Sequence, residues 1–255
     1  MGKKGKIGRL KRKAAPRFWP IHRKEAVWIV RPSSGPHSLE KCLPLSIVLR
    51  DILKVAETRK EAKKIISQGN ICVDGKVRRK DDFPIGLMDV VSMPESKKFY
   101  RIMPSHKGLF HHLISEKEAS FKLARVEGKT VVKNGISQIA LHDGSTLLAT
   151  FGESESPKEV VYDTFDTLKL GLPEREVLAK MKTKKGNFAI ITGGKNIGKQ
   201  GKIVEIEKTV AKKRRNALVV IEDEKGGRYQ TILDFVFSIG EAKPLISLPE
   251  ATSVV

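Results

Sequence analysis

The stretch NFAIITGGKNIGKQGKI at residues 187–203 decides between two folds for the last quarter of the chain. From Gly193 to Gln200 it reads G-x-x-x-x-G-K-Q, one residue short of the nucleotide-binding loop G-x-x-x-x-G-K-[ST]. In that loop the lysine holds phosphates, the Ser or Thr hydroxyl holds magnesium, and a helix follows. Gln200 cannot supply this hydroxyl in the usual way, and GKIVEIEK (201–208) alternates as a strand does. The pattern predicts strand, glycine turn and strand, and it opposes an ATP or GTP site.

The residues that follow extend this β pattern. ALVVIED (217–223) and RYQTI (228–232) both read as strands, and short strands separated by turns predict a small β-barrel. The glycines of the turn are expected to supply positive φ angles or a close approach of strands; they are Gly194, Gly198 and Gly201. Between the strands lies a basic loop made of Lys212, Lys213, Arg214 and Arg215.

Earlier in the chain, two helices and a hairpin are predicted. Apolar residues at helical spacing begin at Leu45 and continue to Leu53, which predicts an amphipathic helix. A second helix begins at Thr58, because TRKE (58–61) is a capping box, and it ends at Gly69. ICVDGKV (71–77) alternates around Asp-Gly and predicts a short hairpin, and FPIGLMDVVSM (83–93) reads as another strand-like run.

The second helix carries like charges at i,i+4 spacing, in the pairs Arg59/Lys63 and Lys60/Lys64. Such pairs mildly destabilise an isolated helix, so we expect a partner outside the helix to neutralise them. A solvated basic face is the alternative. The basic run Arg78-Arg79-Lys80 favours the first interpretation, because the hairpin can fold it beside the helix.

Residues 100–182 predict a β-rich domain with less distinct boundaries. KTVVKNG (129–135) and STLLATF (145–151) are strand-like, and HDG (142–144) is typical of a tight turn. The neighbouring residues His111 and His112 face different ways on a strand, so a surface or RNA-facing position is favoured over a metal site.

Charge is the strongest compositional signal. The chain has 49 Lys and Arg against 29 Asp and Glu, a net charge of +20, which indicates a polyanionic partner. Half of this excess lies in residues 1–31, where Glu25 is the single acidic residue. With few apolar residues, this arm is expected to be disordered in isolation and to become ordered along phosphates. Phe18 and Trp19 offer stacking faces there; a solvated tail or a nuclear-localisation-like patch is the alternative.

Other classes of protein are disfavoured by the composition. Cys42 and Cys72 are too few for a disulfide framework and have no C-x-x-C spacing, so a reducing cytosol is expected and structural zinc is not. No apolar run of 18 residues exists, and no apolar stretch follows the basic start, which opposes a membrane span and a secretory signal.

Several motifs together resemble known ribosomal families. The spacing of Gly194, Gly198, Gly201 and Ile203 resembles the KOW motif, and residues 43–93 resemble the S4-type RNA-binding domain in TRKEAKKII, GNICVDGKV and PIGLMDVV. Together with AAPRFWPI (14–21), SGPHSLEKCLPL (34–45), FVFSIG (235–240) and KPLISLP (243–249), they resemble the S4e family of the archaeal and eukaryotic small ribosomal subunit. The sequences WPI and GLMDVV are similar to those of archaeal members of the family, whereas residues 152–182 match the family only loosely.

This resemblance implies an α+β multidomain protein: a basic N-terminal arm (1–41), a helix-hairpin RNA-binding domain (42–95), a central β-rich domain (96–182) and a KOW-type, SH3-like β-barrel (183–255). It implies a cytoplasmic structural protein of the small subunit that contacts rRNA and neighbouring ribosomal proteins, without catalysis, cofactor, metal, nucleotide or membrane. The candidate RNA-binding residues are Lys3, Lys4, Lys6, Arg9, Lys11, Arg12, Lys13, Arg17, Trp19, His22, Arg23, Lys24, Arg59, Lys60, Lys63, Lys64, Lys76, Arg78, Arg79, Lys80, Lys212, Lys213, Arg214 and Arg215.

Three other functions remain as alternatives: a nucleotide hydrolase using the near-match loop, an RNA-modifying enzyme, and a free RNA-binding regulator. The first lacks a magnesium-holding hydroxyl and a helix after the loop. The second needs a catalytic domain, for which fewer than 90 residues remain between the two binding modules. The third would have much the same sequence, since an arm, a helix and a barrel also occur outside ribosomes.

Overall fold

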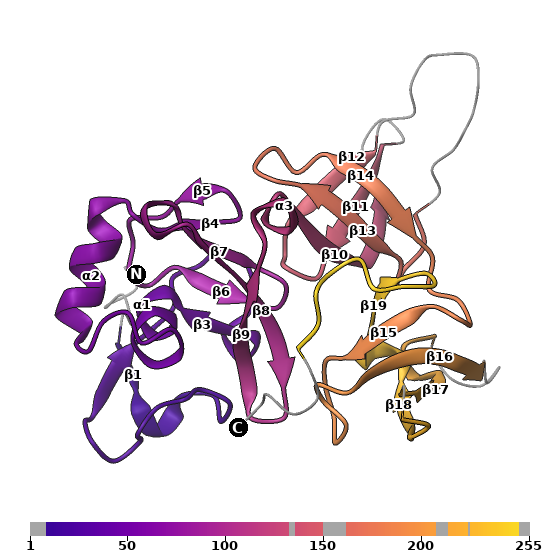
Figure 1. Cartoon of the computed structure of the whole chain (residues 1–255), viewed down its shortest axis with the longest axis horizontal. Helices are drawn as coiled ribbons and strands as arrows, with labels where there is room; N and C mark the ends of the chain where they lie inside the picture. Colours follow the sequence, from indigo (N-terminus) through magenta and orange to yellow (C-terminus); the bar gives the residue numbers. More distant parts are fainter. Residues whose placement is uncertain (1–8, 133–135, 150–161, 208–213, 224, 250–255) are drawn as a thin grey trace, which may run out of the picture. The chain divides into compact units, whose positions relative to one another are not determined.

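The structure, a computed structural model, describes residues 9–132, 136–149, 162–207, 214–223 and 225–249. The chain divides into two compact units, residues 1–103 with 107–116, and residues 104–106 with 117–255. Both are rich in strands and contain few helices, as the sequence predicts (Figure 1). Below, the two are called unit 1 and unit 2.

Unit 1 contains the two predicted helices. α1 (Leu45–Ile47) continues into a π-helical turn (Val48–Ile52), in which the Leu53 N–H donates to the Val48 carbonyl at 2.8 Å. α2 (Arg59–Gln68) begins at Thr58 with a complete capping box, and Gly69 ends it with a left-handed φ of 91°. Both predicted helices are confirmed, the first with a wider last turn.

The strands of unit 1 form one five-stranded sheet and two small ladders. The sheet has the order β5-β4-β7-β8-β9, and it consists of β5 (Lys76–Val77), β4 (Cys72–Val73), β7 (Val90–Met93), β8 (Lys98–Ser105) and β9 (Gly108–Ile114). The ladders pair β1 (Arg9–Lys11) with β2 (Trp28–Val30), and β3 (Cys42–Pro44) with β6 (Pro84–Gly86). The predicted hairpin is confirmed, because Asp74 and Gly75 turn between β4 and β5 with φ values of 51° and 73°.

The sheet continues across the domain boundary expected at residues 95/96. β7 and β8 are antiparallel neighbours, with Val90 opposite Arg101, so residues 98–103 pack with the segment that precedes them. A short 3-10 helix (Pro94–Ser96) turns the chain between them, helped by Lys97 at a positive φ of 50°. This turn carries no strong sequence signal, which is why the segment reads as the start of the next domain.

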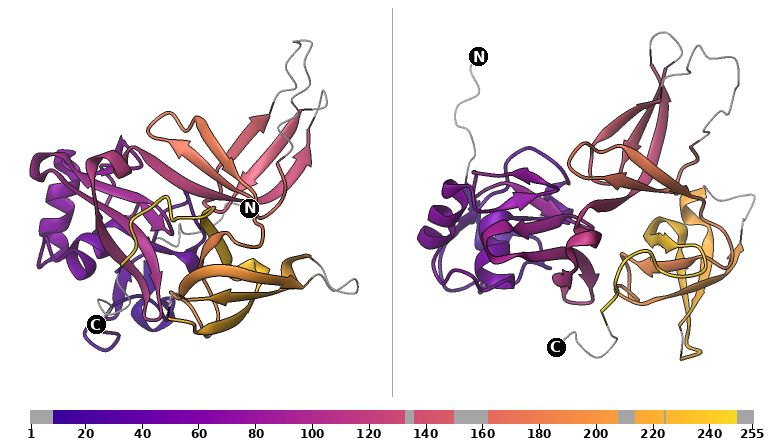
Figure 2. Two further views of the ribbon diagram at one scale, coloured as in Figure 1. Left: turned by 45° about the vertical axis from the view of Figure 1, so that its right-hand side comes forward. Right: turned by 45° about the horizontal axis from the view of Figure 1, so that its top comes forward.

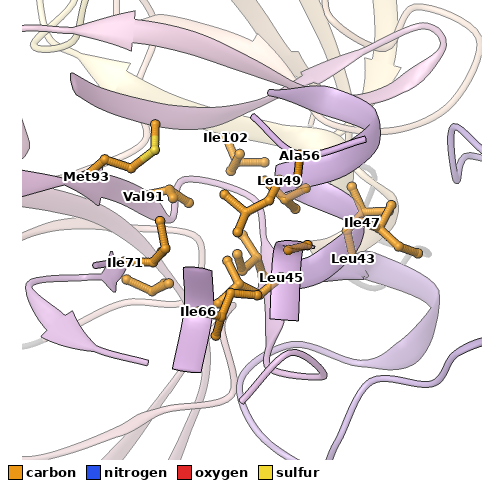
Figure 3. Close-up of a cluster of buried hydrophobic side chains, with 14 of the residues drawn as sticks. Leu43, Leu45, Ile47, Leu49, Ala56, Ile66, Ile71, Val91, Met93 and Ile102 are labelled. Atoms are coloured by element: carbon orange, nitrogen blue, oxygen red, sulfur yellow. The ribbon is translucent and has the colours of Figure 1, made fainter. Parts of the chain in front are cut away.

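One hydrophobic cluster holds unit 1 together. Figure 3 shows side chains from α1, α2 and the sheet pointing toward one another, with Leu45, Leu49 and Ile66 among them. All three are fully buried. Because the cluster draws on segments far apart in the sequence, the two helices depend on it more than on their own propensity.

The N-terminal segment is part of this cluster, which corrects the expectation that residues 1–31 are disordered in the free chain. Ala15 and Trp19 are buried in the cluster, and Leu10, Phe18 and Ile21 pack against it. The prediction is wrong from residue 9 onward, because these apolar side chains cover a core that the helices and sheet leave open. Residues 1–8 lie outside the described residues.

Unit 2 begins with a second five-stranded antiparallel sheet, of order β12-β11-β10-β13-β14, preceded by the short helix α3 (Glu116–Ala119). Its strands are β10 (Phe121–Val131), β11 (Ser137–Leu141), β12 (Thr146–Ala149), β13 (Thr167–Gly171) and β14 (Val177–Met181). Two further features of the prediction are confirmed: residues 146–149 form a strand, and the tight turn at 142–144 has Gly144 at a φ of 80°.

A buried ion pair lies against this sheet. Lys122 and Asp143 are 1% and 0% exposed, and the Lys122 Nζ lies 3.2 Å from the Asp143 Oδ2. The Ser145 N–H and hydroxyl donate to the other carboxylate oxygen at 2.9 and 2.6 Å. Burial by itself raises the pKa of Asp143, but the Lys122 ammonium and the Ser145 hydrogen bonds outweigh it and hold the pKa well below its usual range.

The remaining strands answer the question raised by residues 187–203. β15 (Phe188–Ile191) and β16 (Gln200–Glu207) are antiparallel, and no helix follows the glycine turn between them. β17 (Leu218–Glu222), β18 (Arg228–Ile232) and β19 (Val236–Gly240) complete a sheet of order β18-β17-β16-β15-β19, coloured orange to yellow in Figure 2. Its core includes Ile191, Ile203 and Val219. The strand-turn-strand prediction is confirmed, and the geometry of a phosphate-binding loop is absent.

The glycines of this turn have the structural roles that the sequence predicts. Gly194 and Gly198 have φ values of 79° and 84°, which side chains rarely adopt. At Gly201, a Cβ atom would overlap the Glu222 carbonyl oxygen of the neighbouring strand. A glycine is therefore required at Gly201 by the spacing of β16 and β17.

Replacing Gly201 with alanine is expected to destabilise unit 2 by about 1–3 kcal/mol, because the new methyl group forces two backbones apart. Gly128→Ala is the matched control in another strand of the same unit, since nothing lies within 4 Å of its added Cβ. The control should change the free energy of unfolding by about 0.5 kcal/mol or less. Urea denaturation of both variants tests this, and equal stabilities would contradict the close approach.

The low pKa of Asp143 predicts acid sensitivity of unit 2. Because the folded state holds this carboxylate charged while the unfolded chain protonates it near pH ~4, its stabilisation is present at neutral pH and is lost as the pH falls below about 5. Asp143→Asn leaves Lys122 buried without its counter-charge and should cost about 3–5 kcal/mol at pH 7. Urea unfolding at pH 7 and pH 3 should show that the difference in free energy of unfolding between the wild type and Asp143→Asn is smaller at pH 3. The same difference at both pH values would refute the prediction.

Candidate nucleic-acid interface

The outer face of α2 carries the most concentrated exposed positive charge that the sequence predicted. Ala62 and Ile66 point into the core, so the 3.6-residue period turns Arg59, Lys60, Lys63 and Lys64 outward, where all four are exposed. Within the described part of the chain, the three lysines have no ion pair within 4.0 Å, whereas Arg59 pairs with Asp81 at 3.0 Å. Among the residues that the structure describes, the lysine charges are therefore not compensated by an acidic partner.

The basic run after the hairpin lies beside this helix, as the sequence predicts. The Arg79 side chain reaches Gly69 at the end of α2, where its Nε is 3.5 Å from the position of an added Cβ. Lys76, Arg79 and Lys80 are exposed. Arg78 is half-buried, with its guanidinium 4.3 Å from the centre of the Phe83 ring. We call the surface formed by Lys60, Lys63, Lys64, Lys76, Arg79 and Lys80 the cationic face.

Some of the candidate RNA-binding residues in the N-terminal segment are buried or half-buried, and others are exposed. Arg12 is 8% exposed and donates to Glu25 and to the His22 carbonyl, at 2.7 and 2.6 Å. Arg23 donates to four backbone carbonyls, those of Arg12, Lys13, Ala15 and Pro16. These two arginines tie the segment to itself, so most of their donors are used within the protein.

The structure corrects the stacking role that was predicted for Trp19. Its side chain belongs to the core of unit 1, the residue is 3% exposed, and its indole N–H donates to the Cys42 carbonyl at 2.9 Å. A ring enclosed in this way cannot stack on a nucleotide base. The exposed aromatic residue of this segment is instead Trp28, at 49%. Sequence reasoning missed it, because residues 1–31 were expected to be disordered in isolation, so no strand was predicted at residues 28–30.

The other candidates are on the surface or outside the described residues. Lys11, Lys13, Arg17, His22 and Lys24 are exposed. Arg214 and Arg215 are exposed in unit 2 and contact their own unit, the first through Thr164 at 3.3 Å and the second through Glu127 at 3.6 Å. The residues outside the described ranges are Lys3, Lys4, Lys6, Lys212 and Lys213, and the side chain of Arg9 is likewise not described.

The described residues offer few groups for other kinds of site. Across residues 9–249, apart from the undescribed gaps, no group of three His, Cys, Asp or Glu side chains is placed to hold a metal ion. No described helix has the length and apolarity that crossing a membrane requires. Burial raises the pKa of the Cys42 thiol to about 12, so this thiol is a poor nucleophile.

Comparison with known proteins assigns the chain. Family models match three consecutive segments: the RS4NT (NUC023) domain at residues 4–40, the S4 domain at 43–91 and Ribosomal family S4e at 96–177. The chain is 45% identical over 251 residues to small ribosomal subunit protein eS4 of Desulfurococcus amylolyticus, spanning 98% of this chain and 99% of that one. It is 41% identical to the protein of the same name from Methanocaldococcus jannaschii, spanning 97% and 100%.

A solved structure agrees with this comparison. The 30S ribosomal protein S4e from Thermoplasma acidophilum superposes with a TM-score of 0.63 at 28% identity, over 79% of this chain and 96% of that one. The strand-rich fold and the helix-hairpin segment define a ribosomal protein with an S4 domain. The chain belongs to the ribosomal protein family S4e, which confirms the resemblance drawn from its motifs.

The burial of Trp19 yields a direct test. Trp19→Ala should lower the free energy of unfolding of unit 1 by about 3–5 kcal/mol, because it opens a cavity in the core and removes the hydrogen bond to Cys42. Trp28→Ala, at the exposed aromatic residue, should change it by about 0.5 kcal/mol or less. Chemical denaturation followed by circular dichroism compares the two. Equal losses would contradict the assignment of one tryptophan to the core and the other to the surface.

Proposed function

We propose that the protein is a structural constituent of the small ribosomal subunit that binds and stabilises folded rRNA through phosphate contacts, and so supports translation in the cytoplasm. The observation that carries the proposal is the cationic face, where lysines that form no ion pair with any described residue lie beside an exposed basic run. Membership of the S4e family supports the ribosomal setting and neighbouring ribosomal proteins as further partners.

The proposed mechanism of binding is electrostatic. RNA carries condensed counterions, and each phosphate that a lysine or arginine neutralises releases some of them, which favours association by entropy. Lysine suits this task, since its ammonium is a compact charge on a flexible stem that can follow an irregular backbone. Specificity then comes from the shape of the folded RNA and from unpaired nucleotides, because side chains cannot read the deep major groove of A-form helices.

No catalytic step is assigned to the chain. A nucleotide hydrolase is disfavoured because the loop at 193–200 joins two strands and its Gly198 serves the turn. The protein's contribution is the placement of positive charge on rigid elements, which holds RNA segments together that would otherwise repel one another.

Neutralising three lysines of the cationic face is expected to weaken rRNA binding and to reduce its salt dependence. For K60Q/K63Q/K64Q, the slope of log K against log salt should become shallower by about 2–3, since each lost phosphate contact removes roughly 0.7–0.9. The matched control is K117Q/K225Q/K243Q, three exposed lysines of unit 2, which should leave the slope close to that of the wild type.

Filter binding to small-subunit rRNA over a range of salt concentrations measures both triple variants. Sucrose-gradient sedimentation tests whether the protein is part of the small ribosomal subunit, because the proposal requires stoichiometric co-migration of the wild type with that subunit. A wild-type affinity that hardly changes with salt would overturn the phosphate mechanism, and migration apart from the subunit would favour a free RNA-binding regulator.

A further inference from the structure

Unit 1 contains a pocket of about 610 Å³ on which the proposed function does not draw. It lies among four segments: β2, the helix that begins with α1, the first turn of α2 and the acidic pair Asp81-Asp82. Its volume falls within the range of roughly 300–1,000 Å³ that is typical of small-ligand sites. A single nucleotide is a ligand of that size.

Two arginines at this pocket, Arg50 and Arg59, have guanidinium donors that the described residues do not use, and a third arginine is exposed there. Arg50 and Arg59 are each held by a carboxylate through Nε and Nη2, at Asp51 and Asp81. In the described part of the chain, their Nη1 groups make no hydrogen bond. Arg31 is exposed at the same pocket. Because the carboxylates fix these planar groups, the remaining donors are oriented in advance for an anionic ligand.

Ser46 gives an independent indication that the pocket receives a ligand. The residue is 3% exposed, and its Oγ is buried without a hydrogen-bond partner among the described residues. Its backbone N–H donates to the Asp81 carbonyl at 3.0 Å, which fixes its position in the pocket wall. A buried hydroxyl without a partner costs free energy, so a polar ligand atom at this place would remove the penalty.

Trp28 indicates what kind of ligand fits. It lines the pocket with about half of its surface exposed, in contrast to Trp19 in the core. A simple anion makes no use of an indole face, whereas unpaired RNA bases stack on aromatic side chains. Asp81 and Asp82 add hydrogen-bond acceptors, which would repel a bare phosphate but match a base edge that carries N–H donors.

We propose that this pocket binds one unpaired nucleotide of the RNA. This proposal rests on the proposed function, in which the protein binds rRNA. The base stacks on Trp28 with its N–H edge toward the acidic pair, and the phosphate lies toward Arg31 and Arg50. Guanine fits best, because its N1–H and N2–H₂ groups lie side by side and can donate together to a carboxylate.

The first test uses the full-length protein and free ligands. Millimolar GMP should quench the fluorescence of Trp28 in a saturable way, UMP should do so more weakly, and inorganic phosphate should not, because phosphate cannot stack. Trp28→Leu should abolish the quenching. Absence of saturable quenching by all four 5′-mononucleotides, or an equal effect of phosphate, would overturn the assignment.

The second test uses small-subunit rRNA. Trp28→Ala should weaken binding by about 5- to 150-fold, the range expected for the loss of one stacked base, while the salt slope stays unchanged. Trp28→Phe should recover most of the affinity. Val27→Ala, at the neighbouring exposed residue, is the matched control and should bind as the wild type does.

The outcomes separate the two proposals. If wild-type binding depends steeply on salt but Trp28→Ala binds as tightly as the wild type, the nucleotide pocket is refuted and the phosphate mechanism stands. If the wild type fails to bind small-subunit rRNA, the proposed function itself fails. The near-neutral effect expected of Trp28→Ala on folding keeps a loss of binding from being ascribed to unfolding.

Discussion

The burial of Trp19 is the interaction on which unit 1 depends. This indole brings a strongly basic segment onto a small apolar core and fixes it there through the hydrogen bond to the Cys42 carbonyl. Without it, the core formed by the two helices and the sheet would lack part of its cover, and repulsion among the basic residues would favour an extended chain. Burial of a few apolar side chains thus opposes a large charge excess, and the basic side chains between them stay at the surface.

The arginines and lysines of unit 1 have different tasks. Arg12 and Arg23 bond to backbone carbonyls of their own segment, as planar groups with several donors can. The lysines of α2 instead remain without ion pairs among the described residues. A net charge of +20 is therefore not spread evenly over functional positions. Part of it holds the fold, and the part that is left bare is available to a polyanion.

Structural features that depend on neighbouring residues in the sequence could be predicted, whereas features that depend on packing between distant residues could not. The capping box at Thr58, the left-handed Gly69 and the turn at Asp74-Gly75 are local, and each was predicted correctly. The burial of Trp19 and the exposure of Trp28 depend on packing against residues far along the chain, so the local sequence could not show which of the two tryptophans is exposed. The exposed basic face of α2 was predicted, because the helical period separates its buried and exposed residues. The pocket at Trp28 was missed, because it is formed by four segments that are separate in the sequence.

The pocket at Trp28 exists because segments that are far apart in the sequence come together in unit 1. Its walls need β2 from the N-terminal segment, Ser46 and Arg50 from the first helix, and the acidic pair near the end of the basic run. None of these segments makes the pocket alone, and β2 reaches its place because the preceding residues are anchored at Trp19. In the proposed site, the Trp19 contact would therefore serve both stability and RNA binding: it keeps the basic segment folded and so holds Trp28 beside the arginines of the pocket. In the proposed function the cationic face would hold an RNA backbone of any sequence, whereas a stacking site of the proposed kind would distinguish an unpaired nucleotide from a paired one.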